Sequence, residues 1–379
     1  MSPAPSIPSF EQGPIRPPSE AHSLLVRVIR NCTWNRCTFC PVYKGTKSSQ
    51  RPLEDVLADV EAMAAAAAVL RAEGRTALRG GRLPGEAFQV MLFLHGGERH
   101  VFLQDADPLA VKPEKLAAVV ARVRERFPTV ERVTTYGRAS TLARRTAAQL
   151  GMLREAGLTR VHLGLESGAD EVLMAIDKGC TSGDLIAAGT NAVRAGLELC
   201  FYLMPGLGGR EQAAAHVAGS ARVIRAVAAA APAERPLVVR LRTAAVVPGT
   251  PLAARQAAGE FVLPDDVEVA QELRDLLERL GDARLELRSD HALNLLPGLE
   301  GSLPVDRERL LGMLDGFLAL PREQQARFAV GARLGLFGEI GDLEDPVRMA
   351  RLESQFAGYE QPDADELLAA ATALRARFI

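Results

Sequence analysis

Short β-rich runs alternate with helical patterns between residues 24 and 241, and this alternation constrains the fold more than any other feature. The strand-like runs are residues 24–30, 101–103, 130–135, 161–165, 197–203 and 237–241. Six strand-then-helix units in sequence predict parallel strands joined by right-handed crossovers. Polar motifs follow most of these strands directly, at the edge where βα barrels build their sites. We therefore predict an α/β fold: a partial (β/α)6 TIM-like barrel with a mostly helical C-terminal extension.

The 379 residues divide into three expected regions. Residues 1–15 are rich in Pro and Ser and are expected to be a flexible N-terminus. Residues 16–258 are expected to form the barrel core, with an irregular insertion, rich in Gly and Arg, at about 73–99. Residues 259–379 are expected to form the extension, with one extra strand near residues 285–287. The insertion and the region after residue 260 are expected to shape access of the substrate.

Composition excludes some classes of protein. A hydrophobic fraction of 47% is ample for a buried core, and a net charge of −2 gives no indication of nucleic-acid binding. The longest apolar runs are shorter than a membrane span, so no membrane association is expected. The N-terminus lacks the basic start and apolar centre of a signal peptide. A cytoplasmic location is therefore expected.

Three of the five cysteines lie within nine residues, in the run Cys32-x4-Cys37-x2-Cys40 on the loop that leaves the first predicted strand. Because the cytosol keeps thiols reduced, such crowding indicates a metal site more than disulfides. Three thiolates on one loop can hold three irons of a 4Fe–4S cluster, and the fourth iron then stays open to a substrate.

A structural zinc site is the alternative, since zinc takes four ligands in a closed site. The fourth ligand would come from a distance, from His22, His95 or Cys180. A second CxxC or CxxH run is missing from the sequence, which makes zinc the weaker interpretation.

Together with the run GPIRPPSEA…NCTWNRCTFCPVYKG at residues 13–45, these cysteines resemble the radical S-adenosylmethionine (SAM) superfamily. The nearest branch is related to the anaerobic coproporphyrinogen oxidase, the methylthiotransferases and the Elongator catalytic subunit. The resemblance covers about residues 13–300. It implies a 4Fe–4S cluster held by Cys32, Cys37 and Cys40, SAM as second cofactor, and an electron donor such as flavodoxin or ferredoxin. The usual spacing has one residue fewer between the first two cysteines, which leaves open which carbon–sulfur bond is cleaved.

The resemblance also assigns residues after the second strand. Gln104, Asp105 and Asp107 occupy the position that binds the methionine amino group, and carboxylates suit an ammonium group. The run Gly96-Gly97-Glu98 imitates the family's GGE signature, but it precedes this strand. We therefore interpret it as a chance match to the signature, unless residues 90–94 are the true second strand.

Tyr136, Arg138 and Ser140 follow the third strand and are cofactor-binding candidates by position. For Arg138 a surface salt bridge is an equal alternative. Phe39, between two of the cysteines, and Arg242, after the sixth strand, are assigned to cofactor binding by the same likeness.

The run GLESG…DKG ends the fourth strand and resembles the superfamily strongly. The likeness places Glu166 or Ser167 near the ribose hydroxyls or the amine, and pairs Lys178 with the methionine carboxylate. N-capping of the next helix is the alternative role of Glu166. After the fifth strand, Met204 and Gly206 are expected to pack against adenine, although a tight turn without ligand also fits.

Three further residues stand outside these motifs. His291 could transfer protons near neutral pH, although a hydrogen-bonded histidine at a strand end is the favoured interpretation. Cys200 lies in a predicted strand and is expected in the core, and Cys180 is expected to be a packed side chain.

The sequence thus predicts a radical SAM enzyme. Its cluster would cleave SAM reductively to a 5′-deoxyadenosyl radical, which abstracts hydrogen from an unidentified substrate. One alternative is a haem- or Fe–S-binding, chaperone-like protein without radical turnover. Another is a variant that cleaves a different carbon–sulfur bond.

Overall fold

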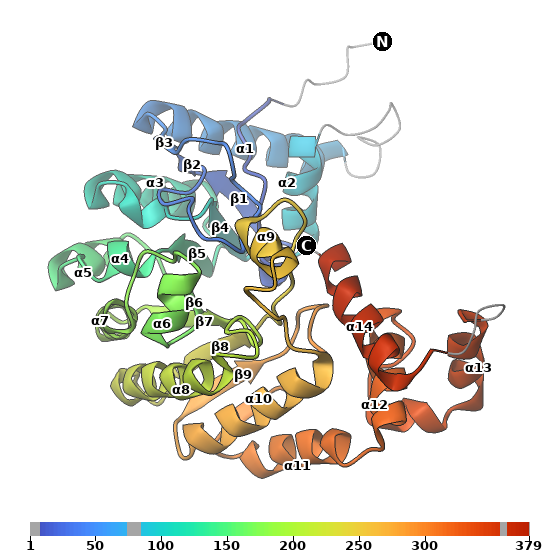
Figure 1. Cartoon of the computed structure of the whole chain (residues 1–379). Helices are drawn as coiled ribbons and strands as arrows, with labels where there is room; N and C mark the ends of the chain where they lie inside the picture. The colour runs from blue at the N-terminus through green and yellow to red at the C-terminus, as the bar shows by residue number, and fades with distance from the viewer. Residues whose placement is uncertain (1–7, 74–84, 357–361, 379) are drawn as a thin grey trace. The chain divides into compact units, whose positions relative to one another are not determined.

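The computed structural model describes residues 8–73, 85–356 and 362–378 (Figure 1). The chain packs as two compact units. Unit 1 holds the described residues of Met1–Asn35, Gly45–Leu163 and Ala188–Leu199, and unit 2 those of Arg36–Lys44, Gly164–Ala187 and Cys200–Ile379.

Eight strands form one sheet in the order β1-β4-β5-β6-β7-β8-β9-β10. Their bounds are β1 Leu24–Arg27, β4 His100–Gln104, β5 Arg132–Gly137, β6 Arg160–Glu166, β7 Glu198–Leu203, β8 Leu237–Leu241, β9 Leu285–Arg288 and β10 Gly301–Leu303. Unit 1 contains the parallel pairs β1–β4, β4–β5 and β5–β6. Unit 2 contains the parallel pairs β7–β8 and β8–β9 and the antiparallel pair β9–β10. The boundary between the units cuts β6 and β7, so each unit holds part of both strands.

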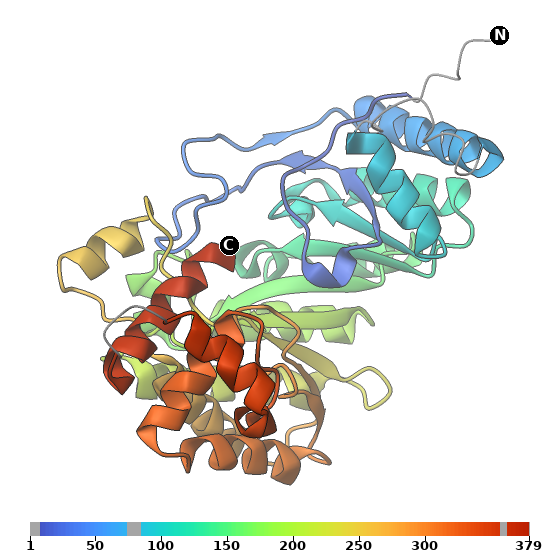
Figure 2. The ribbon, with the colours of Figure 1, turned by 90° about the vertical axis from the view of Figure 1, so that its right-hand side faces the viewer.

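The helices of unit 1 are α1 Leu53–Glu73, α2 Gly85–His95, α3 Pro113–Arg126, α4 Ala139–Leu142 and α5 Ala147–Glu155, and α7 Ser182–Arg194 is shared by both units. Those of unit 2 are α6 Asp170–Ala175, α8 Ala213–Ala230, α9 Pro251–Ala257, α10 Asp266–Leu280, α11 Arg307–Leu318, α12 Arg322–Arg333, α13 Pro346–Ser354 and α14 Ala364–Leu374. Within unit 2, α12 packs on α14 and α10 on α11 (Figure 2). A short β2–β3 hairpin, Ile29–Arg30 with Ser49–Gln50, flanks the cysteine run.

The α/β class, the parallel strands in sequence order and the mostly helical C-terminal region are confirmed. Strands β1, β4 and β5 are buried almost throughout, as is typical of parallel strands. The extra strand near residues 285–287 is β9. The short strand β10 was not predicted, because Gly301-Ser302-Leu303 carries almost no β pattern.

The prediction that residues 73–99 are irregular is wrong for residues 85–95, which form α2. Ala87, Val90 and Phe93 recur at three-residue spacing and are buried. The expected flexible N-terminus and the rest of the insertion fall partly on residues 1–7 and 74–84, which lie outside the described residues.

Gly96-Gly97-Glu98 ends α2 in a Schellman turn. The amide of Glu98 bonds the carbonyl of Phe93 at 3.0 Å, and that of Gly97, at φ +80°, bonds Leu94 at 3.1 Å. The GGE run is therefore a helix cap, and residues 90–94 lie in a helix rather than a strand.

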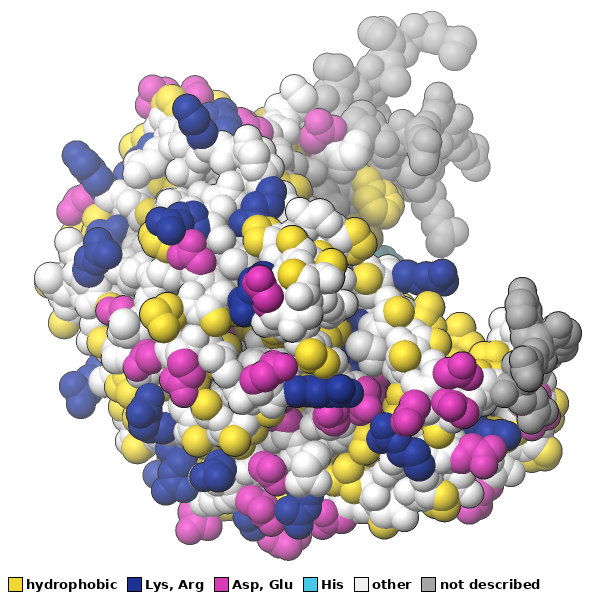
Figure 3. Space-filling view, in the orientation of Figure 1, with side chains coloured by type: hydrophobic (Ala, Val, Ile, Leu, Met, Phe, Trp, Pro, Cys, Tyr) yellow, Lys and Arg dark blue, Asp and Glu magenta, His cyan; other side chains and the backbone are white. Residues whose placement is uncertain are grey.

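Basic and acidic side chains are interspersed on the face shown in Figure 3. None of the helices in the described ranges is long and apolar enough to span a membrane.

Candidate functional site

The three cysteines of the run form no disulfide, and their side chains are partly exposed. Cys32, in unit 1, accepts a hydrogen bond at its sulfur from the amide of Asn35 at 3.3 Å. Cys37 and Cys40 lie in unit 2, where the amide of Cys40 bonds the Cys37 carbonyl at 3.3 Å. Lys44 also donates to that carbonyl, at 2.9 Å.

The donor chemistry of this run fits an iron–sulfur cluster. The boundary between the units falls between Cys32 and Cys37, and no cluster of three metal-ligating side chains is gathered within the described ranges. Three thiols that are accessible and not bonded in disulfides are nevertheless the soft ligands that iron–sulfur centres take.

Asp107, in unit 1, connects the first part of the cysteine run to the segment after β5. Its carboxylate accepts hydrogen bonds from the hydroxyls of Thr33 at 3.0 Å and Thr141 at 2.7 Å, and from the amide of Arg138 at 3.1 Å. Burial raises the pKa of the Asp107 carboxyl, and these hydrogen bonds oppose the rise only in part. The guanidinium of Arg138 lies 5.0 Å from the ring of Trp34, at cation–π distance. Asp107 thus orients the residue next to Cys32.

Gln104 and Asp105 are buried and bind the N-terminal part of unit 1. The Gln104 amide group accepts from the Gly13 amide at 2.8 Å and donates to the carbonyls of Gly13 and Ile15. Asp105 forms an ion pair with Arg27 at 2.6 Å. Both side chains therefore have structural partners, which the sequence did not predict.

Tyr136 packs edge-to-face on Phe102 and His162, with ring centroids 5.1 and 5.7 Å apart. Ser140 lies half-buried on α4, one turn after the β5 end. Both side chains are at the predicted positions, and their roles stay predictions.

Glu166 and Lys178 form an ion pair in unit 2, with Nζ 2.7 Å from Oε1. Burial opposes the charged form of Lys178, but the Glu166 carboxylate and the sulfurs of Cys37 and Cys180 outweigh it and raise the pKa of Lys178. A Cβ atom on Gly164 would lie 2.8 Å from Nζ, so glycine leaves room for this pair. Lys178 therefore carries a positive charge beside one of the predicted cluster ligands.

Ser167 points elsewhere, into the core of unit 2. Its hydroxyl lies 2.8 Å from Nδ1 of His216, and Nε2 of that ring lies 3.2 Å from Oε1 of Glu272. The same carboxylate accepts the amide of Gly206 at 2.9 Å, where φ is +86°. This series of buried contacts, from Ser167 through His216 and Glu272 to the Gly206 amide, fixes the turn after β7. His216 and Glu272 were missed, because nothing in the sequence connects residues 167, 216 and 272.

Phe39 and Met204 belong to one apolar cluster of unit 2. Its buried members are Ile176, Met204, Leu207, Ala244, Leu252 and Phe261, and Phe39, Val246 and Leu263 pack against it. Thr38 donates its amide to Ile176 at 2.9 Å and accepts from Leu252 at 3.0 Å. The second half of the cysteine run is thus anchored to the segments after β6, β7 and β8.

His291 lies at the end of β9, near Arg242. Its Nδ1 accepts the amide of Leu293 at 3.2 Å. Burial, and then the charge of Arg242, lower the pKa of His291 to about 4 despite Asp290. A neutral, hydrogen-bonded ring at pH 7 fits the structural interpretation better than proton transfer. Cys200 is 1% exposed, as expected of a core residue.

Comparisons with known proteins add a family match. A family model described as "Radical SAM superfamily" matches residues 82–215, a range that begins after the cysteine run. No curated protein matches the sequence.

Three solved structures are similar to this chain. Elp3 of the archaeon Methanocaldococcus infernus is 17% identical, with a TM-score of 0.40, over 54% of this chain and 52% of that one. The cobalamin-dependent SAM radical enzyme OxsB is 14% identical, with a TM-score of 0.43, over 94% and 53%. The radical SAM methyltransferase TsrM from Kitasatospora setae is 18% identical, with a TM-score of 0.45, over 92% and 65%. The chain spans about half the length of the first two structures.

Proposed function

We propose, from the premise that residues 82–215 are a radical SAM superfamily domain, that this protein cleaves SAM reductively to start a radical reaction. Members of this superfamily bind a 4Fe–4S cluster and SAM. The observation that carries the proposal is the Cys32-x4-Cys37-x2-Cys40 run, three thiols between β2 and β3 that are in no disulfide.

Cys32, Cys37 and Cys40 would hold the cluster through their thiolates. When bound, the reduced cluster supplies the electron that breaks a carbon–sulfur bond of SAM, giving methionine and a 5′-deoxyadenosyl radical that abstracts hydrogen from the substrate. The chain's own task is to bind, orient and shield these groups from water.

Lys178 is the proposed partner of the methionine carboxylate. Glu166 holds its Nζ at 2.7 Å in a largely buried position, which orients the ammonium before a ligand binds. Asp107 is proposed as a positioning residue that acts on Cys32 through Thr33.

The apolar cluster that includes Met204, with the turn at Gly206, offers a surface on which adenine could stack. Phe39, Tyr136, Arg138, Ser140 and Arg242 are proposed to bind the cofactor by their positions in the sequence motifs. Gln104, Asp105 and Ser167 are proposed to support the site through their structural contacts rather than to touch SAM.

Anaerobic reconstitution with iron and sulfide tests the proposal. The wild-type protein should take up about four irons per chain, and with dithionite and SAM it should form 5′-deoxyadenosine, measured by mass spectrometry. Cys32→Ala, Cys37→Ala and Cys40→Ala should each lose the cluster and the product. Cys200→Ala, at a buried strand position, is the matched control and should keep both.

Other results would replace the proposal. Stoichiometric haem binding without SAM cleavage would indicate a chaperone-like protein, and zinc without iron or sulfide would indicate a structural metal site. A 3-amino-3-carboxypropyl product would retain the cluster but change the bond that is cleaved. Turnover with reduced flavodoxin or ferredoxin in place of dithionite would identify the class of electron donor.

A further inference from the structure

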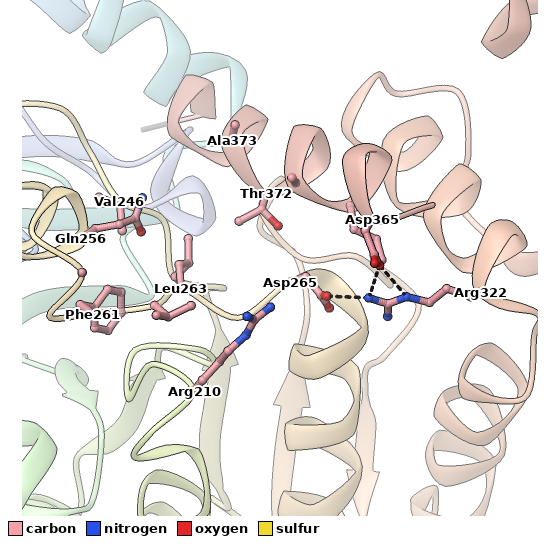
Figure 4. Close-up of a pocket in the computed structure, with 14 residues that line it drawn as sticks. Arg210, Val246, Gln256, Phe261, Leu263, Asp265, Arg322, Asp365, Thr372 and Ala373 are labelled. Carbon is pink, nitrogen blue, oxygen red and sulfur yellow. Dashed lines mark hydrogen bonds and ion pairs between the residues drawn. The ribbon is translucent and has the colours of Figure 1, made fainter. Parts of the chain in front are cut away.

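A cavity of about 660 Å³ lies in unit 2, where the segments after β7 and β8 face α14 (Figure 4). A volume of this size is typical of sites for small ligands, which occupy roughly 300–1,000 Å³. The residues of this cavity belong to none of the motifs to which the sequence assigned cofactor binding.

One wall of the cavity is apolar and shares its packing with the cysteine run. Val246, Phe261 and Leu263 line the cavity, and all three also belong to the apolar cluster or pack against it. Phe39, between Cys37 and Cys40, packs against the same cluster. A ligand on this wall would therefore lie against the packing that supports the proposed cluster ligands.

The opposite wall comes from the C-terminal extension. Leu368, Ala369 and Ala373 of α14 line it, and both alanines are exposed. Thr372 also lines the cavity, and its Oγ1 is buried without a hydrogen-bond partner in the part of the chain that the structure describes. Such a hydroxyl is satisfied at little cost only by a ligand or water.

Two arginines line the cavity, and each forms an ion pair with a carboxylate. Arg322 bonds Asp265 at 3.3 Å and Asp365 at 3.0 Å, so its charge is compensated. Arg210 points into the cavity in Figure 4, and it forms an ion pair with Glu268 through Nε alone, at 2.7 Å. Neither Nη atom of Arg210 has a hydrogen-bond partner among the described residues. An arginine with two Nη atoms available binds a carboxylate or a similar anion.

We propose that this cavity binds the substrate, a small amphipathic molecule with an apolar, ring-sized body and one anionic group. The body would lie between Phe261 and α14, and Arg210 would hold the anion. The assignment as substrate rests on the proposed radical reaction, whereas the binding site itself rests on the cavity alone.

Two dyes of the same size test the binding site on the full chain: anionic 8-anilinonaphthalene-1-sulfonate and uncharged N-phenyl-1-naphthylamine, both followed by fluorescence titration. Arg210→Gln should weaken binding of the anionic dye about 10-fold or more and leave the uncharged dye unchanged. Ala373→Trp, which fills the cavity from an exposed helix position, should abolish binding of both. Arg194→Gln and Ala118→Trp, at exposed helix positions of unit 1, are the matched controls and should bind both dyes as wild type does.

Equal loss of both dyes in Arg210→Gln would refute the anion contact, and unchanged binding in Ala373→Trp would refute the site. Displacement of the dyes by SAM would show that the cavity belongs to the cofactor, and it would overturn the substrate assignment. In reconstituted protein without substrate, Ala373→Trp should still form 5′-deoxyadenosine. If wild type forms none, the proposed function and the substrate assignment fail together, while the dye results decide separately whether the cavity binds anionic amphiphiles.

Discussion

Gly168, the last residue of the GLESG run, lies against Gly219 of α8 with no space between the two backbones. A Cβ atom on Gly168 would come within 2.6 Å of Cα of Ser220 and closer still to the Gly219 carbonyl. A Cβ on Gly219 would come within 2.6 Å of the amide nitrogen of Ala169. Backbone faces backbone on both sides, so no side chain can rotate out of the way. We predict that Gly168→Ala forces the two segments apart.

The magnitude follows from three contributions. Overpacking of this kind costs about 1–3 kcal/mol. The bond from the Gly168 amide to the Ser220 hydroxyl, 3.0 Å long, would be strained or lost, at about 0.5–1.5 kcal/mol. Alanine also lowers the conformational entropy of the unfolded chain, which stabilises the folded state by only about 0.4–1 kcal/mol. Together these contributions span about 0.5–4 kcal/mol, so the free energy of unfolding should fall by about 2 kcal/mol.

Urea unfolding followed by circular dichroism measures this change. Gly312→Ala is the control: nothing lies within 4 Å of its Cβ position inside α11. It should stabilise the protein by about 0.8–1 kcal/mol. The double variant of Gly168 and Gly219 should lose less than the sum of the single losses, because the first alanine already separates the segments. A Gly168→Ala variant as stable as wild type would refute the reasoning.

Three further predictions concern charged groups. Lys178→Met should weaken SAM binding about 10-fold or more, measured by equilibrium dialysis. The double variant that exchanges Glu166 and Lys178 keeps the ion pair, so it should be as stable as wild type but should not bind SAM as wild type does. Wild-type SAM binding by this double variant would mean that the pair is purely structural. Folded His291 takes up a proton less readily than the unfolded chain, because its pKa is lowered from 6.5 to about 4. Stability should thus fall as the pH drops through this range, and His291→Gln should flatten that part of the curve of unfolding free energy against pH. Asp266→Asn leaves two buried arginines without a carboxylate and should destabilise by about 3–5 kcal/mol, whereas Arg375→Met keeps one ion pair and should cost clearly less in urea unfolding.

Strands β1, β4 and β5 were predictable because their burial is nearly continuous, which gives each a short run of β-branched and aliphatic residues. Helix α10 carries signals that a sequence can show, because Asp265 and Glu268 form a capping box at its start, before a strong apolar period. In contrast, α2 follows a stretch rich in Gly and Arg, and this composition led to the prediction of an irregular insertion. The helix was missed because its buried face consists of only three residues.

Partners of the site side chains were not predictable, because each depends on tertiary contacts. Gln104 and Asp107 lie three residues apart and were assigned one role. In the structure, Gln104 donates hydrogen bonds to the backbone at residues 13–15. Asp107 instead accepts hydrogen bonds from Thr33 and from the segment after β5. The positions were visible in the sequence, but the direction of each side chain was not.

Backbone strain gives an indication of the site that is independent of any motif. The described residues include six non-glycine residues with positive φ, and five of these adjoin residues predicted to bind the cluster or SAM, or are such residues. Asn31 and Asn35 flank Cys32, and asparagine tolerates this conformation. Asp105, Glu166 and Asp177 tolerate it less well, and each such residue costs about 1–3 kcal/mol unless its surroundings hold it. The ion pairs of Asp105 and Glu166 are contacts that can hold them in place. The side chains at these turns thus hold two carboxylates at the ends of β4 and β6, where Asp105 pairs with Arg27 and Glu166 pairs with Lys178.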